Sequence, residues 1–359
     1  INNFEDLKNK KVAVQIGTTG AKKAATIPGV TITTFDNLSS ALQELLNGKV
    51  DAVVNDAPAT LYAIKTGNLA NLKIVDELLT EEYYGIALPK NSSNLNLVNG
   101  GLISIIENGT YQAIYEKWFA SQPPSLPVTV PALKSIGTES LKINQIINNL
   151  FQGTLITLRL TILSIFFGTI IGSMIALILI LPHSPGQWLA RFYVDFFRGT
   201  PLLVQIFMIY FGLPALFQEF GIYFNWNRHL AAIIALSLNA SAYLCEIFRG
   251  GIQSIDKGQW EASQGLGMSY LLTMRLIIIP QAFRRILPPL GNEFITLLKD
   301  TSLVAVIGFE ELFRQGQLMV ATTYRAFEIY AMIAIIYLCL TLLLARFFRW
   351  LENQMNLSA

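Results

Sequence analysis

Two short polar segments have residue types that suit the binding of a small zwitterion. Gly17-Thr18-Thr19-Gly20 follows an alternating apolar run that predicts a strand, and a helix is expected from about residue 21. Exposed backbone N–H groups at such a helix start suit an anion such as a carboxylate. Asp56 follows a second apolar run and suits a cation such as an α-ammonium group. The alternative is a plain turn and a plain helix N-cap, and the spacing alone leaves both interpretations open.

A third polar segment predicts a short amphipathic helix between long apolar runs. Asp256 is placed to cap it, with Gln259 at the reciprocal capping-box position, and Gly265 and Gly267 are placed to end it. An exposed Glu261 on such a helix suits a groove on a partner protein. A helix that lies on the lipid surface is the alternative, and both are kept.

Further polar residues lie in or beside apolar runs that are long enough to be membrane spans. They are Asn239, Glu246, Glu293 and Lys299. A charged or polar group inside a membrane is costly, so each is a candidate for a transport pathway. Each is also compatible with a satisfied contact between helices or, for Lys299, with a side chain that reaches the membrane surface.

Other chemistry is excluded by composition. The chain has two Cys and two His, widely spaced, so no metal site and no disulfide framework is expected. It has no Gly-x-x-x-x-Gly-Lys-Ser/Thr loop, so no ATP hydrolysis by this chain is expected, and no cofactor is predicted. A net charge of only +2 argues against a nucleic-acid partner.

The elements that position these segments fall into two parts. The 359 residues are 52% hydrophobic and only 14% charged, with a mean hydropathy of +0.46. Residues 1–130 carry a net charge of −2, and all their basic residues are Lys; residues 131–359 carry +4 and are rich in Arg. The first part is typical of a soluble domain and the second of a membrane protein.

The soluble part alternates strands with helices, which predicts parallel βαβ units. The expected strands are residues 11–16, 31–35, 50–54, 72–75 and 84–88, and helical faces recur at residues 38–46, 95–106 and 110–119. Ligands bind at the carboxyl ends of the strands in such sheets, where Thr18, Thr19 and Asp56 are expected. A Pro-rich linker follows at residues 121–137.

The membrane part predicts five spans. They are expected at residues 160–181, 201–217, 230–245, 286–307 and 329–345, the fourth broken by Pro288-Pro289. Arg and Lys are concentrated in the segments that are cytoplasmic if the soluble part is outside. This bias predicts an extracellular soluble domain, and a cytoplasmic side that carries the Glu261 helix and the C-terminus.

Two motifs in the membrane part carry a family resemblance. Glu261-Ala262-Ser263, Gly267 and Ile277-Ile278-Ile279-Pro280 resemble the EAA loop of ABC-importer permeases, with Ser263 and Ile279 as departures. Phe197-Arg198-Gly199-Thr200-Pro201 and the following residues to Gln205 resemble the second-span signature of polar amino acid permeases. The resemblance covers about residues 138–355. It implies a permease homodimer that docks two copies of a separate ATPase subunit through Glu261, Ala262, Gly267 and Pro280.

The soluble part is similar to the second lobe of amino-acid-binding proteins. The similarity lies in residues 7–20, 50–58 and 111–119. It implies that Gln15, Thr18 and Thr19 contact the ligand and that Asp56 holds its α-amino group. The first lobe, on which residues 94–119 would pack, is expected to precede Leu7 and is absent from this sequence.

The expected fold is therefore a partial α/β binding-protein-like lobe followed by an all-α bundle of five membrane helices. The domains are residues 1–120, a linker at 121–137 and a permease domain at 138–359. The implied function is the substrate-binding and permease subunit of an importer of polar amino acids in the cell membrane. Glutamine is the first candidate by resemblance, and glutamate, asparagine, histidine and arginine stay open. A ligand-gated channel and a membrane-anchored amino acid sensor are the alternatives.

Overall fold

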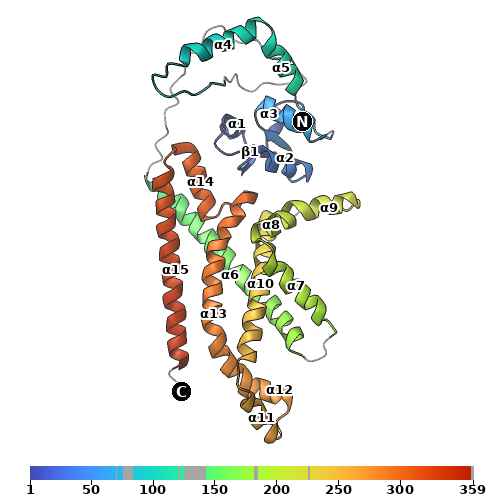
Figure 1. The fold of residues 1–359 in the computed structure, drawn as a ribbon, viewed down its shortest axis with the longest axis vertical. Coiled ribbons are helices and arrows are strands. Elements are labelled where there is room, and N and C mark those ends of the chain that lie inside the picture. The colour runs from blue at the N-terminus through green and yellow to red at the C-terminus, as the bar shows by residue number, and fades with distance from the viewer. Residues whose placement is uncertain are drawn as a thin grey trace. The chain divides into compact units, whose positions relative to one another are not determined.

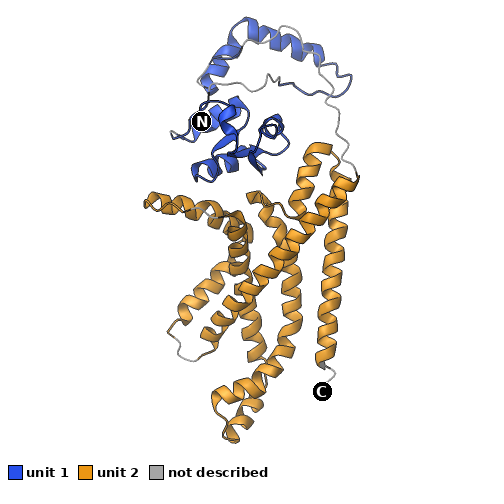
Figure 2. Ribbon diagram, turned by 180° about the vertical axis from the view of Figure 1, so that it is seen from behind, with its two compact units in different colours: residues 1–138 blue, residues 139–359 orange. Residues whose placement is uncertain are grey.

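The structure, a computed structural model, describes residues 1–69, 71–75, 84–119, 122–124, 143–181, 185–224 and 227–356. It divides into two compact units, residues 1–138 and 139–359 (Figure 2). Most of the predicted linker at residues 121–137 lies outside the described residues. Each unit is taken by itself below.

Unit 1 is built around a small parallel sheet. Its elements are η1 (Glu5–Leu7), β1 (Lys11–Gln15), α1 (Thr19–Ala24), β2 (Thr31–Phe35), α2 (Leu38–Leu46), β3 (Ala52–Val54) and α3 (Ala57–Thr66). The strand order is β2-β1-β3, and Val12 of β1 lies opposite Ile32 on one side and Ala52 on the other. β1 is thus the central strand, and Val12 and Val14 are fully buried in the core of the unit.

Two of the five expected strands are wrong. Residues 72–75 and 84–88 form no strand, and Tyr84 and Ile86 are 75% and 62% exposed. A strand needs a neighbour for its N–H and C=O groups. Both sides of β1 are already occupied, and these two segments pair with neither β2 nor β3.

The two helices that follow are confirmed as α4 (Leu95–Glu107) and α5 (Thr110–Phe119). α5 packs on α3 through the Tyr62 and Trp118 rings, whose centroids lie 6.0 Å apart. No residue of α4 or α5 is buried, and their exposed apolar side chains include Leu97 and Trp118.

Unit 2 is helical throughout its described residues. Its elements are α6 (Ile143–Ile180), α7 (Gln187–Gly199), α8 (Leu202–Phe207), the π-helix η2 (Met208–Gly212), α9 (Leu213–Glu219), α10 (Arg228–Gln253), α11 (Lys257–Gly265), α12 (Tyr270–Thr273), the π-helix η3 (Met274–Ile278), α13 (Ile279–Asp300), the 3-10 helix η4 (Thr301–Ile307), α14 (Leu312–Thr323) and α15 (Ala326–Asn356). Figure 1 shows α11 and α12 at the same end of the unit as the C-terminus, and α14 at the other end.

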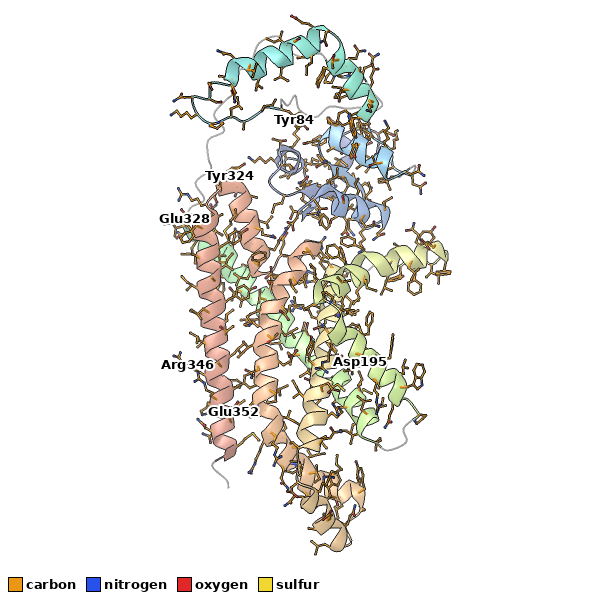
Figure 3. The ribbon with its side chains drawn as sticks, viewed as in Figure 1. Tyr84, Asp195, Tyr324, Glu328, Arg346 and Glu352 are labelled. Carbon is orange, nitrogen blue, oxygen red and sulfur yellow. The ribbon has the colours of Figure 1, made fainter. Side chains whose placement is uncertain are left out.

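Four helical stretches in the described residues are long and apolar enough to cross a membrane. They are Ile143–Ile180, Leu202–Glu219, Arg228–Gln253 and Ala326–Met355. Charged residues lie toward the ends of α15, with Glu328 at one end and Arg346 and Glu352 toward the other (Figure 3). The fourth predicted span corresponds to α13, which is less apolar than these four; it runs between α10 and α15 (Figure 1).

The predicted break at Pro288-Pro289 is wrong, because α13 continues through both residues. A Pro inside a helix removes a hydrogen bond, but its fixed φ fits a helical backbone, and packed neighbours hold such a helix together in a membrane protein. The structure instead places a π-helix just before two other prolines. η2 ends two residues before Pro214, and η3 ends two residues before Pro280.

The most extensive packing in unit 2 joins α6 to α10 through small residues. A Cβ on Gly172 would lie 2.7 Å from the Ser241 carbonyl oxygen, and one on Gly168 would lie 3.2 Å from the Ala240 Cβ. Gly168 and Gly172 are one helical turn apart, so they form a single groove into which α10 fits. Small residues at an interface allow two membrane helices to approach closely.

This packing predicts the effect of a side chain at Gly172. Gly172→Val should destabilise unit 2 by about 1–3 kcal/mol, because overpacking forces two backbones apart. The measurement is the melting temperature of the detergent-solubilised protein. The control is Gly250→Ala on α10, where a Cβ would meet no atom within 4 Å. Equal melting temperatures for Gly172→Val and the unsubstituted protein would contradict the packing.

Candidate functional site

The predicted ligand residues of unit 1 gather at one edge of the sheet. Gln15 ends β1, and Asp56 follows β3 by two residues. A Cβ on Gly20 would lie 3.3 Å from the Val54 carbonyl oxygen, so the Gly17–Gly20 turn abuts the end of β3. The carboxyl ends of β1 and β3 therefore carry the turn and the carboxylate side by side, as the sequence predicts.

The turn is held by its own side chains. The Thr18 hydroxyl donates to the Gln15 carbonyl oxygen at 2.9 Å and accepts from the Ala21 N–H at 3.1 Å, so it caps α1. The Gln15 side chain donates to the Asp36 carbonyl oxygen at 3.4 Å. Thr19 begins α1. The turn interpretation thus holds for Thr18, and the positive end of α1 faces the same edge.

Asp56 differs from an ordinary cap. It stands at the N-cap position of α3, yet its side chain makes no capping hydrogen bond. Its carboxylate accepts instead from the Tyr84 hydroxyl at 3.1 Å. Pro58 lies in the first turn of α3 and lacks an N–H, which removes one donor that a capping carboxylate would use. The Asp56 carboxylate is therefore directed away from its own helix.

The predicted amphipathic helix of unit 2 is α11. The Asp256 carboxylate accepts from the Gly258 N–H at 2.6 Å and so caps it. Gln259 does not complete a capping box; its side chain accepts from the Gln281 amide of α13 at 3.2 Å. The Trp260 ring stacks on Tyr270, with centroids 5.7 Å apart. Trp260 also packs on a buried apolar cluster, so α11 is anchored by one face.

The outer face of α11 and its turn is exposed. Glu261 and Ala262 are both exposed there. Leu266 and Leu271 are 81% and 77% exposed on the chain that follows. A charged side chain flanked by large exposed apolar ones is typical of a surface that contacts a protein or a membrane rather than of a water-facing loop. We call these four residues the α11 surface.

Gly267 and Pro280 fix how α11 joins α13. Gly267 has φ +74°, and the Met268 N–H donates to the Ser263 carbonyl oxygen at 3.0 Å, which is a Schellman C-cap. A Pro in a regular α-helix clashes with the carbonyl four residues before it, here Leu276. η3 relieves this by widening: the Ile279 N–H donates to the Met274 carbonyl oxygen, five residues back.

The second-span signature closes a break between α7 and α8. The Gln205 amide nitrogen donates to the carbonyl oxygens of Phe197 and Thr200 at 2.9 and 3.1 Å. Asn239 of α10 donates to the Gln205 side-chain oxygen at 2.9 Å. Asn239 therefore makes a satisfied contact between helices, which is the second of the two interpretations that the sequence left open for it.

The other candidate pathway residues lie in different surroundings. Glu246 accepts from Arg249 at 3.1 Å and lies 3.8 Å from the Arg198 guanidinium, so it joins α10 to the end of α7. Glu293 of α13 is half-buried, and within the described residues no hydrogen bond or ion pair to it is found. The structure does not bring Asn239, Glu246 and Glu293 into one cluster.

Sequence reasoning missed the buried Glu311. Glu311 is fully buried and caps α14, accepting the Arg314 N–H at 2.7 Å. Glu is not among the residue types preferred at an N-cap, so the usual capping signal was absent. The only hint was a carboxylate just before an apolar helical run.

Comparison with known proteins decides the family of unit 2. The profile of the family described as "Binding-protein-dependent transport system inner membrane component" matches residues 132–357, more than half of the chain. The chain belongs to this family. The match lies almost wholly in unit 2, so it does not include the sheet of unit 1.

Two relatives of this permease are named as amino acid permeases. The glutamine transport system permease protein GlnP of Escherichia coli is 41% identical over 212 residues, which cover 58% of this chain and 93% of that protein. The arginine transport system permease protein ArtQ of Bacillus subtilis is 39% identical over 207 residues, covering 58% and 92%.

Solved structures agree on the fold. One described as an amino acid ABC transporter with histidines has a TM-score of 0.55 and 41% identity, covering 60% of this chain and 99% of that one. An inward-facing MetNI methionine ABC transporter, with a TM-score of 0.51, 19% identity and the same coverage, shares the fold. The chain is thus a multi-pass membrane permease component of an amino acid ABC transporter.

The C-cap of α11 gives a prediction within this permease. Gly267→Ala should loosen α11, because a Cβ at positive φ costs about 1–2 kcal/mol, which corresponds to about tenfold faster opening. The measurement is amide hydrogen exchange of residues 259–266. The matched control is Gly265→Ala, where the backbone is helical and a Cβ would meet no atom within 4 Å. Equal exchange rates in the two variants would refute the cap.

Proposed function

We propose that this chain is the substrate-binding and permease subunit of an ATP-driven importer of polar amino acids, with glutamine as the first candidate substrate. The permease assignment supplies the transport pathway. To this assignment the proposal adds three parts: a binding domain formed by unit 1, a permease homodimer, and a partner ATPase on each copy. The single observation that carries it is the juxtaposition of the Gly17–Gly20 turn and Asp56 at one sheet edge in the chain of a permease.

The chemistry of that edge supports an amino acid ligand. The start of α1 presents a partial positive charge to a carboxylate, and the Asp56 carboxylate offers a partner to an ammonium group. Gln15 and the two threonines add polar groups around the same position. These groups recognise the backbone of an amino acid, so the side-chain preference rests on the relatives that transport glutamine or arginine.

The α11 surface supports docking of an ATPase. It combines Glu261 with exposed Leu266 and Leu271, and its rear face is anchored to α12 and α13 through Trp260. A push on this surface would therefore be transmitted to α13 rather than absorbed by a loose loop. The Schellman cap and the π-helix before Pro280 keep the α11–α13 geometry fixed during that push.

The proposed mechanism is a coupled conformational change. Substrate-loaded unit 1 delivers the amino acid at the outer side, and nucleotide-driven motion of the ATPases rocks the membrane helices between inward- and outward-facing states. In this proposal α13 is a fifth span, and its half-buried Glu293 is the pathway candidate that remains without an identified partner. Asn239 and Glu246 act by holding helices together.

Reconstitution tests the proposal as a whole. The full-length protein is placed in lipid vesicles together with the ATPase of the same importer, and glutamine uptake is measured with and without ATP. Uptake only with ATP supports an importer. Substrate flux without ATP would favour a ligand-gated channel, and binding with no flux would favour a sensor; either result would overturn the proposal.

Asp56 gives a prediction for binding. Asp56→Asn should weaken glutamine binding by the full-length protein about 10- to 100-fold, since a hydrogen bond to a charged group is worth about 1.5–3 kcal/mol. The measurement is calorimetric titration. The matched control is Asp51→Asn at the opposite end of β3, whose carboxylate accepts from the Lys11 N–H at 2.8 Å. Unchanged affinity in the Asp56 variant would refute its assignment.

Glu261 gives a prediction for coupling. Glu261→Ala should reduce copurification of the ATPase and ATP-dependent uptake about tenfold, because a central interface side chain contributes about 1–2 kcal/mol, while glutamine binding stays unchanged. The control is Glu219→Ala, an exposed Glu at the end of α9. Normal uptake by the Glu261 variant, or an equal loss in the Glu219 variant, would contradict docking through the α11 surface.

A further inference from the structure

The Glu311 carboxylate binds groups from three helices. One oxygen accepts the Arg314 N–H at 2.7 Å. The other accepts the Phe313 N–H at 2.9 Å, the Tyr337 hydroxyl of α15 at 3.1 Å and the Thr157 hydroxyl of α6 at 3.5 Å. Glu311 thus caps α14 and at the same time joins it to α15 and α6.

The packing around this carboxylate is unusually close. A Cβ on Gly153 of α6 would lie 2.8 Å from the Leu312 Cα, so α6 touches the first turn of α14. The Thr157 hydroxyl also accepts the Leu312 N–H at 3.1 Å. On the other side, a Cβ on Gly316 would lie 2.0 Å from Ile333 Cδ1 of α15. The three helices also share one apolar cluster, which consists of Leu150, Leu312, Met319, Ile329 and Ile333.

The hydrogen bonds to the Glu311 carboxylate are energetically dependent on one another. A buried carboxylate is costly unless its lone pairs are satisfied, and removing one partner leaves a buried polar group unpaired at about 1–3 kcal/mol. Hydrogen bonds to one carboxylate are also directional, so α14 cannot slide along α6 or α15 without breaking several together. Just beyond the last residue of α13, Thr301 also forms a side-chain hydrogen bond with Tyr337 of α15. Along α13 itself the contact with α15 includes Gly291 against Phe348 and the Phe294 and Phe348 rings, 5.8 Å apart. Apolar surfaces of this kind can slide past each other.

We infer that Glu311 is a positioning residue of the transport cycle: its carboxylate latches α14 to α6 and α15, so that the three helices move as one body while α13 slides against α15. The helices that flank α14 therefore keep their spacing in every state of the cycle. In this inference α13 moves when the α11 surface, which precedes it in the chain, is pushed. Transport then requires that α6, α14 and α15 keep their positions relative to one another while α13 moves. The inference rests on the permease assignment and, for its uptake assay, on the proposed function.

A disulfide that replaces the latch tests the inference. Gly316→Cys with Ile333→Cys joins α14 to α15 at a point where the Ile333 side chain packs against the Gly316 backbone, in a background with exposed Cys339 changed to Ser. With Glu311 intact, the oxidised protein should take up substrate within about twofold of the reduced protein, because a rigid body loses nothing when it is cross-linked. Arrest of uptake by this disulfide would overturn the inference, since it would mean that α14 and α15 separate during transport.

Rescue separates positioning from simple stability. Glu311→Gln should reduce uptake per folded transporter at least about tenfold, and oxidation of the same cysteine pair should restore it. Full uptake by Glu311→Gln, or failure of the disulfide to restore any, would refute the latch.

Tyr337→Phe serves where Glu311→Gln does not fold. The substitution removes a single hydrogen-bond donor and keeps the ring, so uptake should fall few-fold, and oxidation of the cysteine pair should restore it. A loss of uptake that oxidation leaves unchanged would refute the latch. The unsubstituted protein is the reference for uptake, so failure of the proposed function would appear as absent uptake by that protein.

In that case amide exchange of residues 313–316 decides the inference. The exchange rate should rise in Tyr337→Phe and return to the reference rate on oxidation, and no rise would overturn the inference.

Discussion

An interrupted helix leaves backbone N–H and C=O groups that need partners, and inside a bilayer no water supplies them. Gln205 and Asn239 bind the groups freed between α7 and α8. A Schellman cap with Gly267 in the left-handed conformation closes α11. A widened π-turn accommodates Pro280, and Glu311 caps α14 within the bundle. Hydrogen bonds therefore hold the geometry at each interruption. Such fixed geometry is what the proposed transmission of motion along the helices requires.

The sequence predicted the parts of this design that depend on residue type and spacing. Gly267 and Pro280 were placed by a motif, and both occupy backbone positions that few other residues tolerate. The Gly17–Gly20 turn and Asp56 were placed at one sheet edge by the βαβ pattern alone. Long apolar runs predicted a span within each of α6, α10 and α15, because the length of a membrane span is set by the bilayer, but all three helices begin before the predicted spans and α10 and α15 also end after them.

The errors have a common cause, which is that the deciding partner lies far away in the sequence. Residues 72–75 and 84–88 have strand-like composition, but a strand forms only where it pairs with a neighbour, and neither segment pairs with the outer edge of β2 or β3. Pro288 and Pro289 read as a break, yet α13 is held through them by α10 and α15. The role of Glu311 depends on Thr157 and Tyr337, which are 154 and 26 residues away. No local pattern could have joined these three residues.

The central claim is that the α11 surface faces the cytoplasm and receives a nucleotide-driven partner. Cysteine labelling tests it directly, with Gln264→Cys on exposed α11, in a Cys339→Ser background and in intact cells with a membrane-impermeant maleimide. The account predicts no labelling until the cells are permeabilised, and protection from labelling when the ATPase is present. Labelling of this cysteine in intact cells would contradict the account.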